Sequence, residues 1–234
     1  MCGRYTLSES PAEIAKVFSG SLHLSGLHEI LHSNSWRPRY NIAPTQRSLV
    51  ATESDKDARI SAMRWGLIPH WAKDEKISSK LINARAETVA DKPSFRDAFS
   101  KRRCLVFADG YYEWTTQDGV KRPIYIKPTA SKIIAFAGIW ATWRTPEDKA
   151  LQSYSIITTN ANSDLEKIHH RMPVVVPLEQ SMAWISSRTP KEEILQLLQP
   201  SANGTFTYHF VSNYVNSPRN EGHECILPYS TPGT

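Results

Sequence analysis

From Gln46 almost to its end, the chain alternates short apolar segments with turn residues. The segments are rich in β-branched and aromatic residues, which is typical of strands. The predicted strands cover residues 49–52, 60–65, 104–107, 111–114, 123–126, 133–140, 154–159, 174–176 and 205–211. Because no regular helix separates each pair of strands, the pattern argues against a parallel, doubly wound sheet. It predicts an α+β fold around a mixed or antiparallel, barrel-like sheet with short flanking helices.

Two capping boxes mark the places where helices begin. Segment 10–13 (SPAE) has proline at the first helical position and predicts a helix that runs to Phe18. Segment 189–192 (TPKE) predicts a second helix that runs to Leu198. The apolar residues of 182–185 predict a further short helix just before it.

Nothing in the sequence divides the chain into separate units. It has 234 residues, 40% of them hydrophobic, which is enough to bury the core of one large domain. No internal repeat, low-complexity stretch or linker is present. Residues 19–36 follow no regular pattern, and we expect a variable insertion there.

The formal net charge is +5, which favours an anionic partner over an acidic surface. Lysine and arginine are spread along the chain and are not gathered in a tail. A basic surface would therefore have to be assembled by folding.

The three cysteines Cys2, Cys104 and Cys225 are odd in number and widely spaced, which argues against a disulfide framework and favours a reducing compartment. No two of them lie at metal-ligand spacing, so we expect no metal. The apolar neighbours of Cys104 and Cys225 predict buried, inert thiols. No apolar run approaches the length of a membrane span, and no signal peptide is evident, so we expect a soluble cytoplasmic protein.

Cys2 becomes the N-terminal residue if Met1 is removed. It then carries an α-amine with a pKa near ~8 and a thiol with a pKa near ~8.5, so both are partly reactive at neutral pH. With an aldehyde, the amine forms a Schiff base and the thiol closes on the imine carbon to give a thiazolidine. From the N-terminus alone, a cysteine with no chemical role is the commoner case.

Five further segments are denser in polar and aromatic groups than a core requires. They are MCGRYT (1–6), RYNIAPTQ (39–46), RWGLIPHW (64–71) with LINARAET (81–88), ADGYYEW (108–114) and IHHRMPV (168–174). In this order, and with VSNYVNSPRNEGHECILP near the end, the chain resembles the SRAP (SOS response-associated peptidase) family of abasic-site processing proteins. The resemblance covers almost the whole chain. It implies a SRAP domain over 2–228 and a short tail over 229–234.

The resemblance implies four catalytic residues. Cys2 matches the nucleophile that forms a thiazolidine with the ring-opened abasic sugar. Glu113 matches a glutamate that moves protons, and burial among aromatic neighbours would give its carboxyl a raised pKa. His169 matches the histidine that opens the sugar ring, whereas His170 would point elsewhere in an extended segment. Asn83 matches an asparagine that holds the amine in place for attack.

The resemblance also implies a DNA-binding surface, and arginine suits it because its planar fork can bind two phosphate oxygens. Thr158 matches a hydroxyl near the sugar or phosphate. Trp71 matches an aromatic wedge that stacks on a base beside the lesion. The arginines that match contacts to the DNA backbone are Arg4, Arg85 and Arg171, and Arg39 and Arg64 are further candidates.

The expected partner is single-stranded DNA that contains abasic sites, with no cofactor, no metal and no membrane. We expect a monomer that acts in the cytoplasm at the nucleoid, or in the nucleus of a eukaryote.

Three alternatives use the same residues. An N-terminal-nucleophile amidohydrolase would also begin Met-Cys-Gly, with the α-amine as the base for its own thiol, but the chain lacks the arginine and Asn-Gly motifs that hold glutamine. A non-catalytic single-strand binder would leave Cys2 without a role. A peptidase-like autoprocessing activity would remove Met1 or a short leader.

Overall fold

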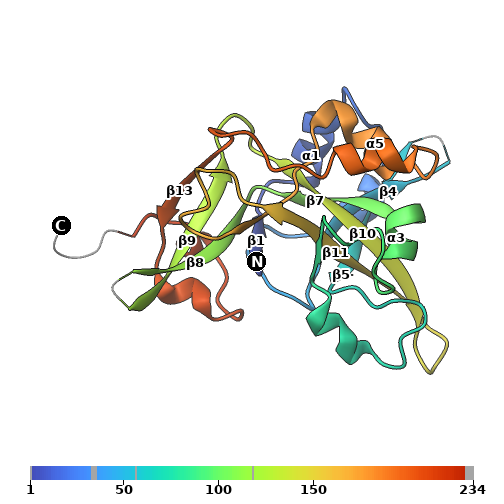
Figure 1. Ribbon diagram of the computed structural model, residues 1–234, viewed down its shortest axis with the longest axis horizontal. Helices are drawn as coiled ribbons and strands as arrows, with labels where there is room; N and C mark the ends of the chain where they lie inside the picture. Colours follow the sequence, from blue (N-terminus) through green and yellow to red (C-terminus); the bar gives the residue numbers. More distant parts are fainter. Residues whose placement is uncertain (1, 33–35, 56, 118, 230–234) are drawn as a thin grey trace.

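Five strands close into a barrel in the computed structural model, which describes all residues except 1, 33–35, 56, 118 and 230–234 (Figure 1). They are β4 (Arg47–Glu53), β5 (Ala58–Trp65), β7 (Arg103–Ala108), β10 (Ile134–Arg144) and β11 (Ala150–Asn160). Neighbours are antiparallel, except that β5 and β11 pair in parallel and close the ring. The predicted mixed, barrel-like α+β fold is confirmed.

Strand β11 is longer than the barrel needs, and its second half carries two further strands. β6 (Asn83–Arg85) pairs with β11 in parallel, on the same edge as β5 but further along the strand. β12 (Arg171–Pro173) pairs with β11 antiparallel, on the same edge as β10. Segments 83–85 and 171–173 therefore lie on the two sides of the same part of β11. The short β2 (Leu24–Ser25) pairs with β5.

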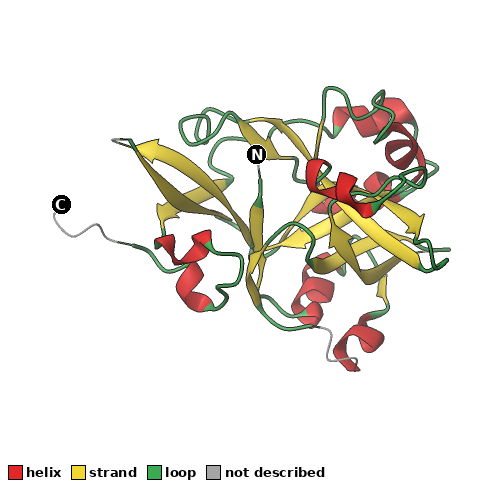
Figure 2. Ribbon diagram, turned by 90° about the horizontal axis from the view of Figure 1, so that it is seen from below, coloured by secondary structure: helices red, strands yellow, loops and turns green. Residues whose placement is uncertain are grey.

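A second sheet has the order β13–β9–β8–β1–β3. Its strands are β13 (Phe206–Phe210), β9 (Val120–Pro128), β8 (Gly110–Gln117), β1 (Arg4–Leu7) and β3 (Arg39–Ile42). Tyr5 and Tyr111 reach Phe136 of the barrel edge-on, with ring centroids 6.2 and 5.9 Å apart. Each such contact adds about 0.5–1.5 kcal/mol beyond burial. In both views β1 lies near the middle of the molecule (Figures 1 and 2).

Short helices lie around the sheets (Figure 2). They are α1 (Pro11–Phe18), α2 (Leu27–His32), α3 (Arg96–Lys101), α4 (Ser181–Ile185) and α5 (Lys191–Gln196), with 3-10 turns η1 (Glu75–Lys80), η2 (Leu178–Gln180), η3 (Asn213–Asn216) and η4 (His223–Cys225). No helix in the described part of the chain is long and apolar enough to span a membrane.

The predicted caps had different outcomes. The hydroxyl of Ser10 accepts from the Glu13 N–H at 3.2 Å, so the predicted start of α1 is confirmed. The second capping box is wrong, because Pro190 itself occupies the N-cap of α5 and no side chain caps that helix. The variable insertion expected over 19–36 contains β2 and α2 where it is described, and its variability stays a prediction; residues 33–35 lie outside the described residues.

The strand predicted over 174–176 is also wrong. β12 ends at Pro173, and Val175 forms only an isolated bridge with Phe136. The backbone here crosses from β11 to β10: the Val174 N–H donates to Ile157 and the Val176 N–H to Ala135. Cys104 and Cys225 are buried free thiols as predicted. Apart from Tyr229, the predicted tail lies outside the described residues.

Candidate active site

Cys2 is completely buried just before β1. Its thiol lies 3.8 Å from the Arg4 carbonyl oxygen, a weak contact for sulfur. Burial raises the pKa of the thiol well above its usual range, and the Glu113 carboxylate raises it further. The thiol is therefore protonated at neutral pH and must transfer its proton when it reacts.

Glu113 lies on β8, one residue after the Arg4–Tyr112 pair that joins this strand to β1. The residue is 3% exposed, and Tyr111, two residues before it, shares its face of the strand and is also buried. Desolvation raises the pKa of the Glu113 carboxyl to about 7, while the positive charge of the amino terminus acts in the opposite direction. The predicted rise is confirmed, and this carboxyl can take or give a proton near neutral pH.

Asn83 joins the start of the chain to the barrel. Its side-chain N–H donates to the Cys2 carbonyl oxygen at 2.8 Å. Its Oδ1 atom is buried and has no hydrogen-bond partner among the described residues. The Asn83 backbone is held by parallel pairing of β6 with Ile156 of β11. An acceptor without a partner is thus held beside the residue that would carry the amine.

His169 stands just before β12, and its ring is half-buried. His169 Nδ1 lies 2.9 Å from the Arg171 backbone N and 3.2 Å from the Arg171 carbonyl oxygen, so the backbone of Arg171 holds the ring. Burial lowers the pKa of His169, and the charge of the amino terminus lowers it further. The expectation that His170 points elsewhere is wrong, because its ring stacks on His169 with centroids 4.4 Å apart. The extended conformation begins only at Arg171.

The amino-terminal charge acts on the pKa values of Cys2, Glu113 and His169 alike. These three groups therefore respond to the same terminal charge, Glu113 also acts on the Cys2 thiol, and Asn83 bonds directly to the Cys2 carbonyl oxygen. The structure brings the four predicted catalytic residues together from the segment before β1, from β6, from β8 and from the segment before β12.

Arg171 has partners within the protein. It is 7% exposed, and its fork binds both carboxylate oxygens of Glu87 at 2.6 and 2.9 Å. The same guanidinium donates to Asn160 Oδ1 at 2.8 Å and to the Thr158 carbonyl at 2.5 Å. The hydroxyl of Thr158 is buried and donates to Ala84 O at 3.5 Å. A role for either residue in DNA binding stays a prediction.

Arg4 and Arg39 also bind protein acceptors. Arg4 donates to Asn41 Oδ1 at 2.7 Å and to the Val215 carbonyl at 2.9 Å. Arg39 binds the Glu221 carboxylate at 2.7 Å. These contacts tie β1 and β3 to the C-terminal segment.

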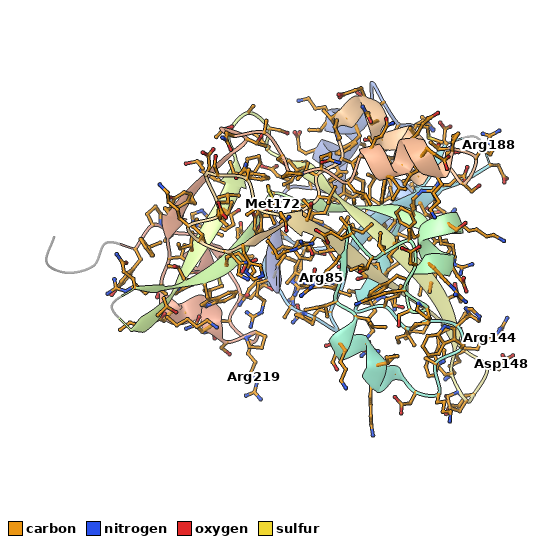
Figure 3. All side chains as sticks on the ribbon, viewed as in Figure 1. Arg85, Arg144, Asp148, Met172, Arg188 and Arg219 are labelled. Carbon is orange, nitrogen blue, oxygen red and sulfur yellow. The ribbon has the colours of Figure 1, made fainter. Side chains whose placement is uncertain are left out.

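Arg85 differs from the other candidate arginines. Its side chain is exposed and makes no hydrogen bond or ion pair with the described residues, whereas Arg64 pairs with Glu75 at 2.6 Å. Arg85 lies in the middle of the molecule in Figure 3, on the strand that carries Asn83. Trp71 is also available, with 49% of its surface exposed in the loop after β5.

Sequence reasoning missed Glu87 and Asn41, which hold two of the predicted arginines. Glu87 belongs to the same LINARAET segment as Asn83. The requirement that a buried arginine have an acceptor could have pointed to it, but only once the burial of Arg171 is known. Among the described residues, no cluster of His, Cys, Asp or Glu could hold a metal ion.

Comparison with known proteins decides the family. A family model described as SOS response associated peptidase (SRAP) matches residues 1–218. The chain belongs to the SRAP family. It is 41% identical to the abasic site processing protein YoqW of Bacillus subtilis, over 97% of this chain and 99% of that protein.

A more distant relative and a solved structure also match over most of the chain. The abasic site processing protein HMCES of Gallus gallus is 31% identical over 97% of this chain and 78% of that protein. A crystal structure of a protein from Bacteroides thetaiotaomicron superposes with a TM-score of 0.86 at 27% identity, over 98% of this chain and 100% of that one. The fold is thus that of an experimentally determined structure.

Proposed function

We propose that this SRAP protein binds single-stranded DNA at abasic sites and forms a covalent thiazolidine crosslink through Cys2 after loss of Met1. The names of the relatives support abasic sites as the target. The observation that carries the chemistry is the placement of a cysteine next to the chain terminus among Asn83, Glu113 and His169.

The reaction begins with the closed sugar. His169 moves a proton between the hydroxyl and the ring oxygen, which releases the aldehyde. The α-amine of Cys2 adds to the aldehyde carbon, and the carbinolamine loses one water to give an imine. The thiol then adds to the imine carbon and its proton passes to nitrogen, which closes the ring. One water is released in total, with no change in oxidation state.

Glu113 suits the proton transfers of this sequence. As a carboxylate it accepts a proton from the α-ammonium, and as an acid it gives that proton to the departing hydroxyl. A group with a pKa of about 7 can do both at neutral pH. Asn83 orients Cys2 through its carbonyl, and its Oδ1 atom can accept from the amine.

Arg85 and Trp71 are the exposed candidates for DNA contact. Arg85 lies on β6, two residues after Asn83, and can bind a phosphate without giving up a partner among the described residues. Trp71 can stack on a base without regard to sequence. The charge of Arg85 and the ring of Trp71 would act on ground-state binding.

We expect Arg85→Ala to lower the affinity for single-stranded DNA while the protein stays folded. Loss of one phosphate contact should reduce the slope of log K against log salt by roughly 0.7. Titrations at several salt concentrations measure this. Arg188→Ala is the matched control, because Arg188 is also exposed but lies far from Arg85, at the edge of the molecule (Figure 3). An equal slope change in both variants would contradict the assignment.

The free α-amine is required, so one residue inserted before Cys2 should abolish the crosslink while DNA affinity is kept. A denaturing gel with abasic oligonucleotide shows the covalent adduct, and intact mass shows whether Met1 is lost. A fully active extended protein would defeat the mechanism. A glutaminase assay of the same protein distinguishes crosslinking from the amidohydrolase alternative, because the alternative predicts release of ammonia from glutamine and no DNA adduct.

A further inference from the structure

We propose that Glu87 is a positioning residue that holds His169 and Asn83 in register through Arg171. This inference rests on the proposed function, and it adds a residue that lies outside the four catalytic groups. Its basis is a single guanidinium that connects both flanks of β11.

The guanidinium of Arg171 spans β11 from one side to the other. Arg171 is on β12, along one edge of β11, and Glu87 follows β6, which lies along the opposite edge. Between them, the same fork binds the Thr158 carbonyl and the Asn160 side chain of β11 itself. The strand that carries Asn83 and the strand next to His169 are therefore fixed at a set spacing.

The backbone of Arg171 holds the His169 ring in place. Its N–H lies 2.9 Å from Nδ1 and its carbonyl oxygen lies 3.2 Å from the same atom. A shift of β12 along β11 would move this donor and release the ring. Because Arg171 is buried and bound to Glu87 at two oxygens, the carboxylate opposes such a shift.

The Glu87 carboxylate also balances charge near His169. The amino terminus, His170 and Arg171 act electrostatically on His169, and all three charges lower its pKa. Without the carboxylate, the Arg171 charge would be left uncompensated. Loss of Glu87 should therefore lower the pKa of His169 further, an effect that loosened packing alone would not produce.

The test compares Glu87→Gln with Glu87→Asp in the full-length protein. Glu87→Gln removes the charge but keeps the shape, and we expect crosslinking to abasic single-stranded DNA to slow by roughly tenfold, since small misplacements of reacting groups are costly. The acidic limb of its pH–rate profile should move to lower pH. Glu87→Asp keeps the charge with a shorter reach, so its rate should fall while the pH profile stays near that of wild type. Glu166→Gln removes an exposed carboxylate close to His169 in sequence and should change neither.

An NMR titration of the His169 ring in the DNA-free proteins tests the inference separately from the reaction. We expect a lower ring pKa in Glu87→Gln than in wild type, and a value near that of wild type in Glu87→Asp. If wild type forms no adduct, the proposed function fails while this titration still tests the positioning role. A wild-type rate together with an unchanged His169 titration in Glu87→Gln would overturn the proposal. If Glu87→Gln does not fold, a wild-type rate in Glu87→Asp overturns it.

Discussion

Cys2→Ala should form no heat-stable adduct with abasic DNA, yet borohydride should still trap it. The alanine variant retains an α-amine, so it can form the Schiff base, but it has no thiol to close the thiazolidine ring. Reduction of the imine then gives a covalent secondary amine. The measurement is a pair of denaturing gels, with and without borohydride, and strand cleavage by β-elimination is expected without it.

The control for this variant is Cys225→Ala, which removes a buried thiol from the smaller apolar cluster of the second sheet. It should crosslink like wild type. Cys2→Ser should behave like Cys2→Ala, because an oxazolidine is the less stable ring. A heat-stable adduct of Cys2→Ala in the absence of reductant would mean that another residue is the nucleophile.

Glu113→Gln should slow crosslinking by about 10²–10⁴-fold and should also make the protein more stable at alkaline pH. The rate falls because the amide cannot move the protons of imine formation. The stability rises because the buried carboxyl has its pKa raised from 4.5 to about 7, so the folded wild-type protein is penalised once this group ionises.

The sign of the effect fixes the pH window. Below about pH 4.5 the carboxyl is protonated in both the folded and the unfolded state, so the two proteins should be equally stable apart from the substitution itself. Above pH 7 the wild type should be less stable than Glu113→Gln by about 3 kcal/mol. Chemical denaturation at pH 4 and pH 9 measures the difference. Glu147→Gln, at an exposed turn, should show neither change, and a wild-type rate in Glu113→Gln would remove Glu113 from the mechanism.

The sequence predicted those parts of the fold whose signals are local. The cap at Ser10 and the apolar runs of the barrel strands could be recognised from neighbouring residues alone. β1, β3 and β6 were missed as strands because each has three or four residues and is held mainly by pairing with distant segments. Their pairing depends on tertiary register, which no local pattern encodes.

The candidate site shows the same division. Cys2 and Asn83 were proposed from motifs, and the structure places them in direct contact. The partners of Arg171 and Arg4 could not be foreseen, because Glu87 and Val215 come close to them only when distant segments meet. An arginine in a motif does not reveal whether its acceptor is a phosphate or a carboxylate.

The parallel pairing of β5 with β11 has a consequence for the order of events during synthesis. The two strands are roughly ninety residues apart in sequence, and such distant pairings form late in folding. The barrel therefore cannot close around the first residues of the chain until residues near 154 have left the ribosome. An aminopeptidase has access to Met1 during this interval, whereas Cys2 of the finished fold has no exposed surface. We expect maturation of the nucleophile to be co-translational, with folding as the step that ends it.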